Sequence, residues 1–141
     1  MIIYAGPTLL VRLLDPAQSG TFEHSAEVQI VSTAQALAEC TADAVADGLA
    51  RGMTPEGALA RLGELVDAET GLVEIWELDA ETVEASAADI AQNGVAAGHA
   101  WHLAAAAACF EDLAEPHEAR CFGADDGRQA LLARSRGWTV I

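Results

Sequence analysis

Short apolar runs alternate with longer amphipathic segments along this chain. Residues 1–14 begin with the apolar run Met1 to Tyr4, turn at Gly6 and Pro7, and continue with leucines at helical spacing. This pattern predicts a strand, a tight turn and an amphipathic helix. Further strands are predicted at residues 28–31, 72–78, 119–122 and 137–141.

Helical periodicity and capping residues predict helices between these strands. Ser32 or Thr33 caps a helix that ends near residue 50, and Thr54 followed by Pro55 begins a second helix, so residues 33–67 are expected to form a helical hairpin. The alternation predicts an α/β fold, a three-layer α/β/α sandwich around a mainly parallel, twisted sheet of four to five strands in a single domain, residues 1–141. Further helices are predicted at residues 79–93, 96–113 and 126–136, with a turn at 15–20 and a short helix at 22–26.

The composition fits one domain that needs no crosslinks. With 141 residues, 52% of them hydrophobic, the chain can bury a core without disulfides or structural metal. Cys40, Cys109 and Cys121 lie in apolar segments without metal-ligand spacing, so we expect buried thiols in a reducing compartment. No basic leader precedes the first strand and no apolar run is long enough to cross a bilayer, which predicts a soluble cytoplasmic protein without membrane partners.

The charge balance is unusual. Seven arginines and no lysine stand against 22 acidic residues, and the net charge is −15. Nonspecific affinity for nucleic acids comes mainly from cationic contacts, so RNA is disfavoured as a partner. Two origins of the acidity stay open: a high-GC genome that avoids lysine codons, or a salt-rich cytoplasm in which charge is screened. The second origin weakens the argument against RNA.

Four separated segments carry a resemblance to a known family. Residues 1–14 form the opening strand and helix, residues 31–39 a strand end followed by a helix with Glu39, residues 95–104 a helix start containing His99, and residues 121–131 a strand end with Asp125. In this order and spacing they are similar to PIN-domain proteins, which include the VapC-type toxin ribonucleases. The resemblance implies a metal-dependent ribonuclease fold over nearly the whole chain.

The resemblance also locates the family's catalytic magnesium site. Its acidic positions correspond here to Gly6, Glu39, His99 and Asp125, at the carboxyl ends of parallel strands or beside them. Magnesium prefers oxygen ligands in octahedral geometry. Gly6 has no side chain and His99 offers a nitrogen ligand, so two of the four acidic positions are substituted and only Glu39 and Asp125 match the family.

Neighbouring residues could replace the missing acids. Asp126 follows Asp125, and Asp43 lies one helical turn beyond Glu39. Carboxylates mixed with imidazole suit manganese or zinc better than magnesium, so the candidate metal ligands are Glu39, Asp125, Asp126 and His99.

Other aromatic and imidazole side chains favour structural roles. His102 follows His99 on the same helix and is expected to be a buried, hydrogen-bonded histidine. Trp76, Trp101 and Trp138 lie in apolar segments, where core packing is a more common role than base stacking.

Two functional hypotheses follow from the resemblance. In the first, the protein is a VapC-like member with a degenerate metal site that is inactive or strongly impaired as a magnesium-dependent endoribonuclease and acts through protein binding. In the second, it is an active ribonuclease of a toxin–antitoxin pair that uses a histidine-containing manganese or zinc site. The family implies a homodimer and a small antitoxin-like partner in both cases.

Overall fold

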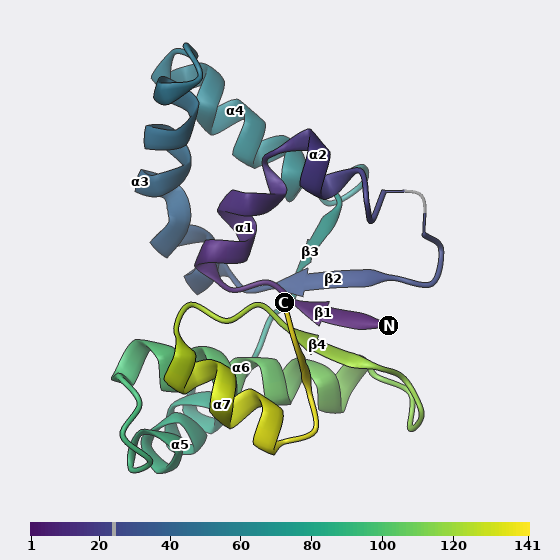
Figure 1. Cartoon of the computed structure of the whole chain (residues 1–141), viewed down its shortest axis with the longest axis vertical. Helices are drawn as coiled ribbons and strands as arrows, with labels where there is room; N and C mark the ends of the chain where they lie inside the picture. Colours follow the sequence, from purple (N-terminus) through teal and green to yellow (C-terminus); the bar gives the residue numbers. More distant parts are fainter. Residues whose placement is uncertain (24) are drawn as a thin grey trace.

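A five-stranded, all-parallel sheet lies between two layers of helices in the computed structural model, which describes residues 1–23 and 25–141 (Figure 1). The predicted three-layer α/β/α sandwich is confirmed. The strand order is β3-β2-β1-β4-β5, so the first strand of the sequence lies at the centre of the sheet. The strands are β1 (Ile2–Tyr4), β2 (Gln29–Ser32), β3 (Val73–Ile75), β4 (Arg120–Phe122) and β5 (Thr139–Val140).

Alternating side chains of β1 divide the core between the two faces of the sheet. Ile2 and Tyr4 pack into one cluster and Ile3 into the other, and all three are almost completely buried. In register, Ile3 lies between Ile30 of β2 and Cys121 of β4. Burial on both faces explains why the strand sequences are continuous apolar runs rather than alternating ones.

One face of the sheet is covered by the helices that precede β3 in the sequence (Figure 1). In the helical hairpin, Gly48 lies against Ala58, and a Cβ atom at position 48 would come within 2.4 Å of the Ala58 Cβ. Small residues therefore set the close approach of the two helices. This layer contains α1 (Pro7–Leu13), α2 (Pro16–Ser19), α3 (Ala34–Ala50) and α4 (Pro55–Leu65).

The opposite face is covered by the helices that follow β3 (Figure 1). The alanine-rich α6 buries Ala100, Leu103 and Ala104 in the same core cluster as Phe122 of β4, and its small side chains allow close packing. Trp138 is buried there as predicted, with its ring edge-on to Phe110 at 5.0 Å. The layer contains α5 (Ala80–Ala91), α6 (Ala97–Leu113) and α7 (Gly127–Ser135).

Side chains cap the starts of four helices, two of them at the predicted residues Thr33 and Thr54. Side chains of Thr33, Thr54, Asp79 and Asp126 each accept a hydrogen bond from a backbone N–H in the first turn of α3, α4, α5 and α7. Each cap satisfies a donor that the helix itself cannot.

Several predicted boundaries differ from the structure. The segment 15–20, expected to be a turn, contains α2 instead. The Ala17 N–H donates a hydrogen bond to Asp15 Oδ1 at 2.9 Å, so Asp15 caps the helix, and Pro16 suits its first position. The expected short helix at 22–26 is absent at residues 22, 23, 25 and 26, which form turns or irregular structure, and His24 lies outside the described residues. The third and fifth strands are also shorter than predicted: each pairs with a single neighbour, and the paired residues are only Val73–Ile75 and Thr139–Val140.

The three thiols are free and buried, as predicted. Burial raises the pKa of Cys40 to about 11 and that of Cys109 to about 12, so both stay protonated near neutral pH. Within residues 1–23 and 25–141, no helix has the length and apolar character needed to span a bilayer.

Candidate functional site

Position 6 faces the Asp125 carboxylate at the carboxyl end of the central strand. Gly6 follows β1 and caps α1 with φ −72° and ψ 179°, a conformation open to any residue. A Cβ atom built there would lie 3.7 and 3.9 Å from the two carboxylate oxygens of Asp125, and 3.3 Å from the Gly123 carbonyl oxygen. A side chain at position 6 would therefore reach Asp125, at the cost of a small shift of the loop at Gly123.

Asp125 is held by backbone and side-chain contacts from two elements. Its Oδ1 accepts a hydrogen bond from Thr8 N at 3.3 Å, in the first turn of α1. Its backbone N–H donates to Gln129 Oε1 at 2.7 Å, and Gln129 Nε2 donates to the His99 carbonyl oxygen at 3.1 Å. Gln129 is fully buried and so ties the Asp125 loop to the start of α6.

Glu39 is joined to a buried histidine from the opposite helical layer. Its Oε2 lies 2.6 Å from His102 Nε2, and His102 Nδ1 lies 2.8 Å from the Tyr4 hydroxyl. Tyr4 is 0% and His102 is 1% exposed. The prediction that His102 is a buried, hydrogen-bonded histidine is confirmed.

The proton positions in this network follow from its end groups. Burial raises the pKa of Tyr4, so its hydroxyl stays protonated. A carboxylate only accepts, so His102 Nε2 carries a hydrogen and donates to Glu39. In the neutral histidine, Nδ1 then accepts from the Tyr4 hydroxyl. The pKa of Glu39 is raised by partial burial but lowered more by hydrogen bonds from His102 and Gln35, and lies below its usual range.

His99 is paired with Asp126 rather than with Glu39 or Asp125. His99 Nδ1 lies 2.8 Å from Asp126 Oδ2, although Nδ1 has no well-formed hydrogen bond to any residue that the structure describes, so the pair is a close polar contact. The N–H of Gln129 donates to Asp126 Oδ1, and this bond, with His99, holds the pKa of Asp126 below its usual range.

The predicted metal ligands fall into separate contacts. Glu39 contacts His102, Asp126 contacts His99, and Asp125 contacts the first turn of α1. Across residues 1–23 and 25–141, no group of three or more His, Cys, Asp or Glu side chains is arranged to hold a metal ion. As they stand, these side chains do not fit the octahedral oxygen site that magnesium requires.

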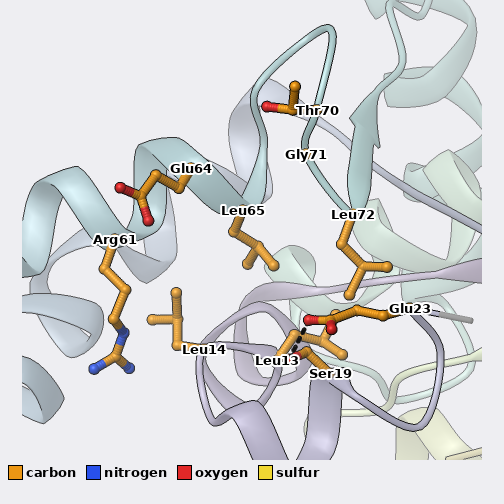
Figure 2. A pocket seen from close by; sticks show the side chains of 10 residues that line it. All are labelled: Leu13, Leu14, Ser19, Glu23, Arg61, Glu64, Leu65, Thr70, Gly71 and Leu72. Carbon is orange, nitrogen blue, oxygen red and sulfur yellow. Dashed lines mark hydrogen bonds between the residues drawn. The ribbon is translucent and has the colours of Figure 1, made fainter.

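A second feature is a hollow of about 410 Å³ between α1, α2, α4 and the loop before β3 (Figure 2). Its apolar part is formed by leucines, and Glu23 and Glu64 contribute carboxylates. Arg61 also lines it, but its guanidinium is paired with Asp47 at 2.7 Å. The charge left over in the hollow is therefore negative. The leucines are Leu13, Leu14, Leu65 and Leu72.

Comparison of the chain with family models, with curated proteins and with solved structures gave no match. The site is therefore defined by its own geometry. Sequence reasoning missed two of its members, Tyr4 and Gln129, because each lies in an apolar or helical segment and acquires its role through residues distant in the sequence. The local signal for Tyr4 is a hydroxyl within a buried apolar run, whereas Gln129 lies between exposed Arg128 and buried Ala130 and has no comparable signal.

Proposed function

We propose that this chain is a PIN-like protein that has lost metal-dependent hydrolysis and acts by binding another protein. The Glu39–His102 contact carries this proposal. Because Glu39 Oε2 accepts a 2.6 Å hydrogen bond from buried His102, this oxygen is occupied by a structural contact instead of being free to bind a metal ion. The histidine cannot turn away without leaving the Tyr4 hydroxyl poorly paired, since Thr33 Oγ1 is 3.4 Å from it.

The surrounding positions support the same conclusion. Gly6 provides no carboxylate opposite Asp125, and the imidazole of His99 neutralises Asp126 when protonated. Removing ligands from a hydrolytic metal site removes both the activated water and the stabilisation of charge in the transition state. We expect ribonuclease activity to be lost or severely reduced.

The hollow in Figure 2 supports a protein partner with a basic amphipathic segment. Its leucines can take an aliphatic side chain, and Glu23 and Glu64 can attract Lys or Arg. The net charge of −15 favours a cationic partner over an acidic one. A small antitoxin-like protein would have this chemistry, and a homodimer is a further expectation from the family.

Restoring the acids tests the catalytic part of the proposal. We expect the wild type not to cleave RNA with magnesium, manganese or zinc, and the double variant Gly6→Asp with His99→Asp to gain magnesium-dependent cleavage. The control is Gly6→Asn with His99→Asn, which has the same size without the charges. If the wild type cleaves RNA with manganese or zinc and Glu39→Gln abolishes the activity, the proposal is wrong and the histidine-containing nuclease is favoured.

Charge reversal tests the binding part. A synthetic helical peptide with Leu at i, i+3 and i+4 positions and Arg on its flanks is titrated against the protein by calorimetry. Glu64→Arg should weaken its binding about tenfold or more by introducing like charge at the hollow. Glu84→Arg, an exposed position of α5 in the opposite layer, should not change it. Equal effects of the two variants would show that the attraction is not located in this hollow.

A further inference from the structure

A separate hollow of about 350 Å³ lies where α3, the end of β3, α5 and α6 meet. Trp76 and Trp101 line it together with Leu78 and Val83. Both tryptophans are only half-buried, unlike Trp138 in the core. The volume is in the range of small-molecule sites, and two indoles from different elements at one hollow are a typical lining for a flat or rounded apolar ligand.

Both indoles are held in place by neighbours. Trp76 Nε1 donates a hydrogen bond to Asp112 Oδ2 at 3.2 Å. The Trp101 ring is edge-on to His102, with ring centroids 5.1 Å apart and an angle of 84° between the planes. Because His102 is itself fixed by Tyr4 and Glu39, the Trp101 ring has a rigid support. Such preorganisation lowers the entropy lost when a ligand binds.

The charges around this hollow have one sign. Glu77 lines it, and Gln35, another lining residue, donates to Glu39 Oε1 at 2.9 Å. The hydrogen bond from Trp76 Nε1 also holds the Asp112 carboxylate beside the Trp76 indole. Among the described residues that line the hollow, none carries a positive charge. An organic anion would therefore be repelled, and a cation attracted.

We infer that this hollow binds a small organic cation of the quaternary ammonium type. Indole faces attract cations through the ring quadrupole, and a trimethylammonium group combines a diffuse positive charge with an apolar surface. Glu77 supplies the opposite charge at the edge of the hollow. The inference is independent of the proposed loss of hydrolysis, because neither tryptophan is among the residues expected to bind metal or RNA.

Calorimetric titration with choline and with its neutral isostere 3,3-dimethyl-1-butanol tests the inference. The two probes have the same shape, so the charge is the only large difference between them. Choline should bind at least about tenfold more tightly, as expected for a cation against indole. Equal affinity for the two probes, or no heat with choline at millimolar concentration, would overturn the inference.

Variants locate the binding. Trp101→Leu and Glu77→Gln should each weaken choline binding about fivefold to tenfold. Glu56→Gln, at an exposed position of α4 in the other helical layer, is the matched control and should leave it unchanged. Glu77 is exposed, so Glu77→Gln remains informative if the tryptophan variant fails to fold. Choline binding that is unchanged in Glu77→Gln would overturn the inference.

The same chemistry occurs in free trimethylammonium compounds and in trimethyllysine side chains. A short peptide containing trimethyllysine is therefore titrated beside choline, with the unmethylated peptide as its control. Tighter binding of choline identifies a free ligand, and tighter binding of the methylated peptide identifies a modified protein as the source. Preference for the unmethylated peptide over both would contradict a quaternary ammonium site.

Discussion

Removing the two buried partners of the Tyr4–His102 hydrogen bond, singly and together, tests whether these residues act as one unit. Tyr4→Phe keeps the ring that stacks on Phe122, with centroids 5.7 Å apart and planes 5° from parallel, and deletes only the hydroxyl. His102→Leu deletes both nitrogens at a position that is 1% exposed. Each single variant leaves one buried polar group without its main partner.

The expected magnitudes follow from burial. In Tyr4→Phe, His102 Nδ1 loses the hydroxyl that donates to it, in a site without access to water, which costs about 1 to 3 kcal/mol. In His102→Leu, the Tyr4 hydroxyl keeps only Thr33 Oγ1 at 3.4 Å, and a similar cost of about 1 to 3 kcal/mol is expected. The Glu39 side chain is 38% exposed, so water replaces its lost partner.

The double variant should be less destabilised than the sum of the two single variants, because no unpaired group remains at the contact. We expect a coupling of about 1 to 2 kcal/mol in a double-mutant cycle. The assay is urea unfolding at neutral pH followed by tryptophan fluorescence, with equal denaturant slopes required for all four proteins. His117→Leu, at an exposed position, is the control and should change stability by less than about 0.5 kcal/mol. Additive single effects would refute the network.

Three further predictions concern packing, pH and salt. Gly123→Ala should lower the free energy of unfolding by about 1 to 3 kcal/mol, because the new Cβ would lie 2.7 Å from buried Leu9. Gly98→Ala is the control and should be neutral or stabilising, because no described heavy atom lies within 4 Å of a Cβ at that position. Equal urea midpoints for the two variants would contradict the predicted clash with Leu9. The pKa values of Glu39 and Asp126 are lowered in the folded protein. Their full contribution to the free energy of unfolding is therefore present above the ordinary carboxyl pKa, and it is lost as the pH falls through their pKa values in the folded state. Urea midpoints should fall below about pH 5, and the fall should be smaller in Glu39→Gln. Raising NaCl from about 0.05 M to about 1 M should raise the melting temperature by screening the net charge of −15, and an unchanged or lower value would refute self-repulsion.

Local signals predicted most of the fold. A cap such as Thr33 acts on an N–H three residues away, and helical periodicity is a property of neighbouring turns, so both can be recognised without knowing the tertiary structure. Leu59 shows the limit of periodicity. It lies three residues before buried Leu62, a helical spacing that favours a shared apolar face, yet it is 47% exposed, because one row of side chains, Ala58, Leu62 and Leu65, already covers the contact with the core.

The candidate site was less predictable because its contacts join distant segments. Glu39 and His102 are 63 residues apart, and nothing near either residue indicates that α3 and α6 present them to each other. The apolar segments around Trp76 and Trp101 predicted core positions, but both indoles are only partly buried against the core and also line a hollow. An apolar sequence indicates burial without showing whether a further layer covers the side chain.

The place of β1 at the centre of the sheet has a consequence for synthesis of the protein. The strand is made first, but one of its two neighbours, β4, lies near the other end of the sequence. Tyr4 and Phe122 therefore cannot stack until all the residues between them have left the ribosome. During that time the apolar Ile2–Tyr4 segment has an unpaired strand edge, so the nascent chain is exposed to aggregation and to chaperone binding until β4 arrives.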